Sequence, residues 1–86
     1  MKKILVLIPA FNAEKTISSL IEQISAFIDK KDILVVDDGS KDTTFQIATN
    51  CGVQVLQHKK NKGKGEALKT GFEYAIMEGY SGVITL

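Results

Sequence analysis

The chain has 86 residues, of which 44% are apolar and 24% are charged, and its formal net charge is +1. This length is enough for one small domain, and chains this short bury only a modest share of their surface. The near-neutral charge gives no electrostatic footprint for nucleic acid or for an anionic membrane surface, so neither partner is expected.

The composition also bears on location. The single cysteine, Cys51, cannot form an internal disulfide, and the short apolar run near the N-terminus lacks the cleavage site of a signal peptide. No segment approaches the length of a membrane span. We therefore expect a cytoplasmic chain, in which any membrane association of the full-length protein comes from sequence outside these residues.

Strand-like and helix-like segments alternate along the chain. The first apolar run, Lys3–Ile8, predicts a buried strand. Apolar residues at intervals of three and four positions then predict a helix over about 13–28, with Asn12 as its N-cap. The expected buried stripe of this helix comprises Ile17, Leu20, Ile21, Ile24, Phe27 and Ile28.

Further strands are predicted at Ile33–Val36, Val53–Leu56 and Val83–Leu86, because these runs are short, continuous and rich in β-branched residues. A second helix is predicted from about residue 42 to just before Gly52, with Phe45 and Ala48 facing inward. A third is predicted over about 65–78 and ends at Gly79. Its expected buried stripe comprises Leu68, Phe72, Ala75 and Ile76.

This alternation predicts an α/β fold, a Rossmann-like parallel sheet of about four strands joined by right-handed crossovers. The fourth strand is expected beside the first. There it would leave an edge and apolar faces uncovered, which predicts self-association through the exposed sheet edge.

Ligands of such sheets bind where the strands end, so the residues that follow each strand are the candidates for a site. After the first strand, Pro9 fixes the backbone, Phe11 offers an aromatic face to a planar ring, and Glu14 offers a carboxylate at a helix start. The alternative is that Phe11 caps the core and Asn12 only caps the helix.

Two acids, Asp37 and Asp38, follow the second strand, and the turn at Gly39-Ser40 aims them. Adjacent carboxylates can bind a base or ribose, hold a metal, or cap the next helix. Because neighbouring side chains at a strand end point in opposite directions, we expect one to face the ligand and the other to support the turn. The alternative is a pair of capping or solvated acids.

A basic, glycine-containing segment follows the third strand. Lys64 lies between Gly63 and Gly65 at a helix start, where backbone N–H groups and a positive charge suit a diphosphate. The spacing is that of neither a P-loop nor a dinucleotide fingerprint, and a solvated lysine run is the alternative. Cys51 and His58 have no partner of their type, so they are interpreted as a packing residue and a loop residue without a role in nucleophilic catalysis.

Three segments, in this order, resemble the N-terminal half of a family 2 glycosyltransferase with the nucleotide-sugar-binding GT-A fold. The first, Ile8–Glu14, is similar to the family's Pro-x-Tyr-Asn-x-Glu opening, and the second, Val35–Thr44, to its second-strand signature. The third, Asn61–Leu68, resembles the polyprenyl-phosphate branch, which includes dolichyl-phosphate mannosyltransferases. Each segment alone is moderately specific, whereas the three together are specific and extend over the whole chain.

The resemblance implies roles for the residues after the first strand. Pro9 and Phe11 would line the base pocket, with Phe11 in the place usually held by Tyr, so that stacking is kept and a phenolic hydrogen bond is lost. Glu14 would lie near the ribose. In the polyprenyl-phosphate branch the position of Ala13 is often also Glu, and this departure leaves the donor open.

Roles are implied for the other two segments as well. Asp38 would accept a hydrogen bond from the base N–H, and Asp37 would assist the turn or the ribose. Lys64 would approach the diphosphate. The implied donor is a UDP- or GDP-linked sugar.

The resemblance also implies a glycosyltransferase that transfers the sugar with inversion to an acceptor hydroxyl or a lipid phosphate, such as a polyprenyl phosphate. The Asp-x-Asp motif that binds Mg or Mn in the family would follow the fourth strand, so its ligands, the catalytic base and the acceptor site are expected outside residues 1–86. The chain would then be the nucleotide-binding N-terminal part, truncated before that motif and inactive alone.

Two other functions are alternatives to a glycosyltransferase. The first is a non-catalytic nucleotide-binding or regulatory α/β module. The second is a receiver-like signalling domain, suggested by the paired aspartates. The receiver alternative is weak, because its acids would be expected after the first strand.

Overall fold

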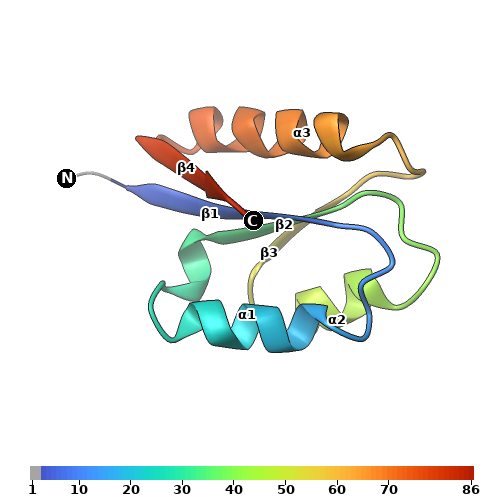
Figure 1. Ribbon diagram of the computed structural model, residues 1–86. Coiled ribbons are helices and arrows are strands. Elements are labelled where there is room, and N and C mark those ends of the chain that lie inside the picture. The colour runs from blue at the N-terminus through green and yellow to red at the C-terminus, as the bar shows by residue number, and fades with distance from the viewer. Residues whose placement is uncertain (1–2) are drawn as a thin grey trace.

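The computed structural model describes residues 3–86. Four parallel strands form a single sheet in the order β3-β2-β1-β4, and helices lie on both of its faces (Figure 1). The strands are β1 (Ile4–Ala10), β2 (Ile33–Asp37), β3 (Gln54–Gln57) and β4 (Gly82–Thr85). The predicted α/β class is confirmed, and β4 lies beside β1 as expected.

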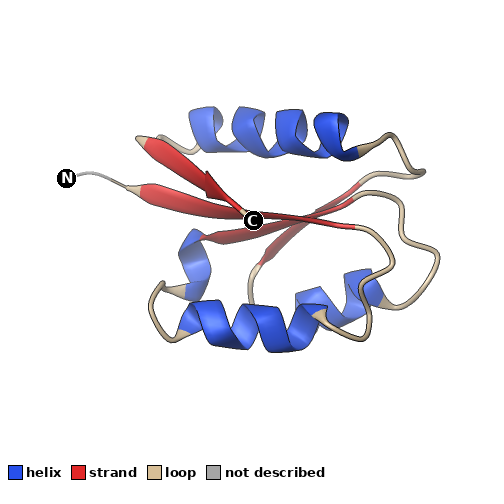
Figure 2. Cartoon of the chain, viewed as in Figure 1, coloured by secondary structure: helices blue, strands red, loops and turns tan. Residues whose placement is uncertain are grey.

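The helices form two layers. On one face lie α1 (Ile17–Ser25) and α2 (Thr44–Asn50), and on the other lies α3 (Lys64–Met77) (Figure 2). A short 3-10 helix, η1 (Lys30–Asp32), leads into β2. Each face of the sheet therefore has a helical cover and its own apolar cluster.

The central strands are buried on both faces, which explains why their sequences are continuously apolar. Val6 and Val35 pack toward α1 and α2, whereas Leu7 and Val36 pack toward α3. All five residues of β2 are buried. The two central strands thus hold the core, and their carboxyl ends emerge from it at one edge.

The first helix is shorter than predicted, and Asn12 is not its N-cap. Asn12 has φ 51°, in the left-handed region, and its side-chain oxygen accepts a hydrogen bond from the amide of Lys41 at 2.9 Å. A turn closed by the amide of Ile17 onto the carbonyl of Ala13 precedes the helix. The hydrogen bonds of residues 12–14 to the loop after β2 replace helical hydrogen bonds, so the helix begins only at Ile17.

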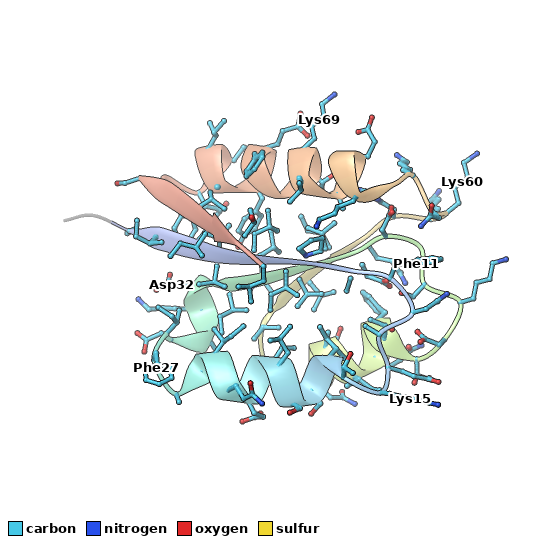
Figure 3. All side chains as sticks on the ribbon, in the orientation of Figure 1. Phe11, Lys15, Phe27, Asp32, Lys60 and Lys69 are labelled. Atoms are coloured by element: carbon cyan, nitrogen blue, oxygen red, sulfur yellow. The ribbon has the colours of Figure 1, made fainter. Side chains whose placement is uncertain are left out.

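Phe27 was expected in the buried stripe and is instead 89% exposed. The helix ends at Ser25, so Phe27 lies beyond the last turn and leaves the apolar face that the periodicity assigned to it. Figure 3 shows its side chain at the opposite end of the molecule from Phe11.

The buried face of α3 also differs from the prediction. Its buried residues are Ala67, Gly71 and Ala75, while Phe72 and Ile76 are 42% and 78% exposed. A row of small residues at intervals of four allows the helix backbone to lie close to the sheet. Hydrophobicity alone selected the larger side chains, and close packing favoured the smaller ones.

Candidate functional site

Three loops meet at the carboxyl edge of the sheet. They are the β1–α1 loop (11–16), the β2–α2 loop (38–43) and the β3–α3 loop (58–63), and each carries one of the polar segments noted in the sequence. Because the strands are parallel, their carboxyl ends face the same way. The fold therefore brings together segments that are far apart in the chain.

Side chains tie the first two loops to each other. The amide of Asn12 donates to Ser40 Oγ at 2.8 Å, and the amide of Lys41 donates to Asn12 Oδ1 at 2.9 Å. The amide of Ala13 donates to the buried hydroxyl of Thr44 at 2.8 Å. These bonds satisfy backbone groups that have no helix or strand partner.

Glu14 takes part in the same contact between the two loops. Its Oε1 accepts hydrogen bonds from the amide of Thr43 at 3.1 Å and from the hydroxyl of Thr43 at 2.7 Å. Its own amide donates to Asp42 Oδ2 at 3.2 Å. The structure thus places Glu14 between the loops.

Asp37 and Asp38 are both buried, and they serve different parts of the site. Asp37 Oδ1 accepts from the amide of Ser40 at 3.1 Å, and its Oδ2 accepts from Gln57 Nε2 at 3.2 Å. The first bond closes the turn after β2, and the second ties Asp37 to β3. Asp37 therefore supports the backbone, as expected for one of two neighbouring side chains that point apart.

Asp38 is the centre of the contact between the second and third loops. Its Oδ1 accepts from the amide of Lys62 at 2.9 Å and lies 2.7 Å from Nδ1 of His58. Its Oδ2 accepts from the amide of Gly63 at 2.8 Å and from Asn61 Nδ2 at 3.2 Å. A carboxylate offers about four acceptor positions, so these four donors fill them.

These contacts decide the charge of Asp38. Burial would raise the pKa of its carboxyl group, but the hydrogen bonds from His58 and from the amides of Lys62 and Gly63 outweigh burial and lower the pKa below its ordinary value of 3.8. Asp38 is therefore a carboxylate at neutral pH and acts as an acceptor only.

Sequence reasoning missed the role of His58. Its Nε2 lies 2.8 Å from the Thr70 hydroxyl on α3, so the ring bridges Asp38 and that helix. The available signal was its place directly after a strand. The strand register, which pairs Asp37 with Gln57, decides that His58 comes beside Asp38.

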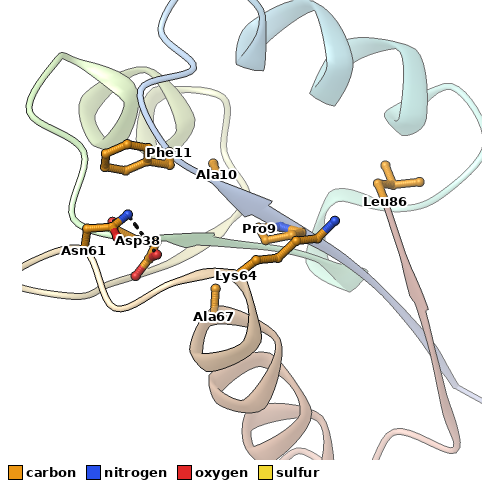
Figure 4. A pocket seen from close by; sticks show the side chains of 8 residues that line it. All are labelled: Pro9, Ala10, Phe11, Asp38, Asn61, Lys64, Ala67 and Leu86. Atoms are coloured by element: carbon orange, nitrogen blue, oxygen red, sulfur yellow. Dashed lines mark hydrogen bonds between the residues drawn. The ribbon is translucent and has the colours of Figure 1, made fainter.

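A cavity of about 340 Å³ opens at this edge of the sheet (Figure 4). Its lining comprises Pro9, Ala10, Phe11, Asp38, Asn61, Lys64, Ala67 and Leu86. Four of the six residues predicted for the site belong to this set, whereas Glu14 and Asp37 do not. In Figure 4, Phe11 and Lys64 reach the cavity from different segments, the ring from the β1–α1 loop and the amine from the first residue of α3.

The cavity combines an aromatic face, a carboxylate, a primary amide and an ammonium group. Phe11 is 48% exposed, so a face of its ring is accessible. Lys64 adds its charge to the positive end of the α3 dipole. Such a set suits a ligand with a planar heterocycle at one end and an anionic group at the other.

A divalent cation does not fit the residues present. Between residues 3 and 86, no group of three or more His, Cys, Asp or Glu side chains is placed to hold a metal ion. Asp38, the one carboxylate of the cavity lining, has N–H donors on both oxygens, the opposite of what a cation requires.

None of the helices in the described part of the chain is long and apolar enough to cross a bilayer.

Residues 5–84 match the family described as glycosyl transferase family 2. The chain is 44% identical over 75 residues to the uncharacterized protein MJ1222 of Methanocaldococcus jannaschii. This match covers 87% of this chain and 30% of that protein. It is 33% identical over 78 residues to the dolichyl-phosphate beta-glucosyltransferase ALG5C of Trichomonas vaginalis, covering 74% of this chain and 23% of that enzyme. The chain thus spans about a third or less of the length of these relatives.

A solved structure shares the fold. It is the glucosyl-3-phosphoglycerate synthase of Mycobacterium tuberculosis in complex with Mn²⁺, uridine-diphosphate-glucose and glycerol 3-phosphate. The match has a TM-score of 0.75 and 34% sequence identity, and it covers 85% of this chain and 30% of that one.

Proposed function

The chain belongs to glycosyltransferase family 2, and from this membership we propose that its described residues bind the nucleotide of a nucleoside-diphosphate sugar. The whole protein would transfer the sugar, with inversion, to an acceptor hydroxyl or a lipid phosphate. The observation that carries the proposal is the convergence of Phe11, Asp38 and Lys64 on one cavity from three separate segments.

In the proposed complex the base stacks on Phe11 and lies against Pro9. The loop contacts of the neighbouring Asn12 fix the backbone next to Phe11 before the ligand arrives. Stacking of a base on an aromatic side chain contributes about 1–3 kcal/mol. A phenolic hydroxyl is not needed for this contact.

Asp38 is proposed to accept a hydrogen bond from a ring N–H of the base. Its four acceptor positions are occupied, so one donor must give way. The side-chain amide of Asn61 is the donor most readily displaced from Asp38. Asn61 is exposed and lines the cavity, and its hydrogen bond is the longest of the four that the carboxylate accepts. Its amide would then donate to a carbonyl oxygen of the base.

The Asp38–Asn61 pair would thus recognise a ring N–H next to a carbonyl. Uracil and guanine both present this edge, so UDP and GDP are both candidate ligands. Lys64 and the N-terminal amides of α3 are proposed to bind the diphosphate. Glu14 and Asp37 are proposed to shape the loops rather than to touch the ribose, in accord with their contacts.

A lipid phosphate is the acceptor that we propose, on the strength of the dolichyl-phosphate glucosyltransferase among the relatives. Since the described residues offer no group of ligands for a divalent cation, nucleotide binding by this chain should depend only slightly on Mg²⁺ or Mn²⁺.

Isothermal titration calorimetry with UDP and GDP, with and without EDTA, tests the proposal. Phe11→Ala should weaken binding about tenfold, the middle of the range for one base–aromatic stack, while Phe11→Tyr should bind like wild type. Phe27→Ala is the matched control, because Phe27 is 89% exposed and lines no part of this cavity.

Lys64→Ala separates the two ends of the ligand, since it should weaken binding of UDP and leave binding of uridine unchanged. If the wild-type chain binds neither UDP nor GDP, or if Phe11→Ala and Phe27→Ala behave alike, the proposed function is wrong.

A further inference from the structure

The cavity depends on a carboxylate that the nucleotide would meet and on a helix that would carry its diphosphate. The first part directly follows β2 and the second is α3, with 25 residues of chain between Asp38 and Lys64. One side chain joins them directly. His58 contacts Asp38 Oδ1 at 2.7 Å and Thr70 Oγ1 at 2.8 Å.

Burial makes this bridge well defined. The side chains of His58 and Asp38 are 10% and 5% exposed, so water has little access to either. In a buried pair a hydrogen bond is electrostatically stronger than at the surface, and a missing partner is costly. His58 itself is not among the residues that line the cavity.

The direction of the two bonds follows from their chemistry. An ionised carboxylate only accepts, so Nδ1 of His58 carries the proton shared with Asp38. In the neutral ring, Nε2 then accepts the hydrogen of the Thr70 hydroxyl. The chain of contacts thus runs from α3 through the ring to the carboxylate.

We infer that His58 is a positioning residue of the nucleotide site: its Nδ1–H orients the Asp38 carboxylate toward the cavity, and the Thr70 hydroxyl on Nε2 holds the ring in this tautomer. The inference rests on the proposed function, and it adds a residue that acts on the nucleotide only through Asp38. Loss of the Nδ1 contact should allow the carboxylate to turn and its loop donors to shift.

Two conservative variants separate the two bonds. His58→Asn places an amide N–H near the Nδ1 position and keeps a donor for Asp38, whereas His58→Gln places its amide near the Nε2 position and keeps the contact with Thr70. Each removes one hydrogen bond, so a merely structural role predicts similar effects of both. A positioning role predicts that His58→Asn binds UDP or GDP like wild type and that His58→Gln binds about tenfold more weakly.

The chain has one histidine, so its imidazole signals in a long-range ¹H–¹⁵N NMR spectrum are unambiguous. The wild-type spectrum should show the Nδ1–H tautomer, and Asp38→Asn should change the tautomer or its populations. Addition of UDP should shift these signals although the ring lies outside the cavity.

The outcomes are distinguishable. Binding by the wild type together with equal affinities of His58→Asn and His58→Gln would overturn the role of His58 and leave the proposed function standing. An Nε2–H tautomer would also overturn it. Absence of any UDP or GDP binding by the wild type would overturn the proposed function and, with it, the positioning role.

Discussion

At Gly39 the backbone of the second loop lies close to that of the third. Gly39 has φ 73°, a conformation that side-chain-bearing residues rarely adopt, and a Cβ at this position would lie 2.3 Å from the backbone carbonyl carbon of Lys60. Neither loop can yield cheaply, because Asp38 holds the amides of Lys62 and Gly63. The glycine is thus required by close approach as well as by backbone geometry.

Gly39→Ala should therefore lower the free energy of unfolding by about 1–3 kcal/mol, the cost of strain plus overpacking. Urea denaturation followed by circular dichroism measures the change. Gly65→Ala is the matched control, because nothing lies within 4 Å of its Cβ and its φ is not positive, so it should be neutral or stabilising. Equal stability of the two variants would contradict the close approach at Gly39.

At the scale of one element, α3 shows how a helix can pack through its small residues. Ala67, Gly71 and Ala75 face the sheet, and a Cβ at Gly71 would lie 2.4 Å from the methyl carbons of the fully buried Leu7. The contact sets the height of the helix above β1. It also sets where Lys64, the first residue of α3, lies relative to the cavity.

Gly71→Ala should destabilise the chain by about 1–3 kcal/mol through overpacking, although alanine is the better helix former by about 1 kcal/mol. In a Leu7→Ala background the clash is gone, and the same change should become neutral or stabilising. Chemical denaturation of the four proteins of this double-mutant cycle gives the coupling energy. Additive effects would show that Leu7 is not what opposes the Cβ.

At the scale of the whole molecule, the sheet has an incompletely covered edge. In β4 the side chain of Ile84 is 53% exposed, and Leu86 just after it is 51% exposed. The register pairs Ile84 with Val6, which belongs to the cluster facing α1 and α2, so Ile84 lies on that face of the sheet. The outer side of β4 carries backbone groups that can pair with another strand.

Residues 1–86 on their own should therefore self-associate as concentration rises. Size-exclusion chromatography with light scattering should show a concentration-dependent mass, which Ile84→Lys shifts toward the monomer. Ile76→Lys is the matched control, because Ile76 is 78% exposed but lies on α3 and not on a strand. A wild-type monomer at all concentrations would refute this prediction.

Local pattern was sufficient for much of this architecture. Continuous apolar runs marked β1 and β2 because these strands are buried on both faces, shorter apolar runs marked β3 and β4, and the alternation with helices then implied a parallel sheet. Glycines ended α2 and α3 as expected, with positive φ at Gly52 and Gly79. The same reasoning failed at Phe27, because α1 ends at Ser25 before that residue is reached. It failed at Phe72, because periodicity ranks residues by hydrophobicity and does not contain the distance between the helix and the sheet.

The sequence was enough to predict Phe11, Asp38 and Lys64 as candidate ligand-binding residues, because they stand where strands end and a helix begins. The tertiary fold fixed which of the predicted residues share a cavity and which hold the loops together. It also decided the partnership of His58 with Asp38, since the register of β2 and β3 sets that contact. Composition and spacing are properties of neighbouring residues, so they can be read from the sequence. The register of the strands and the distance between a helix and the sheet arise from contacts between segments that are distant in sequence.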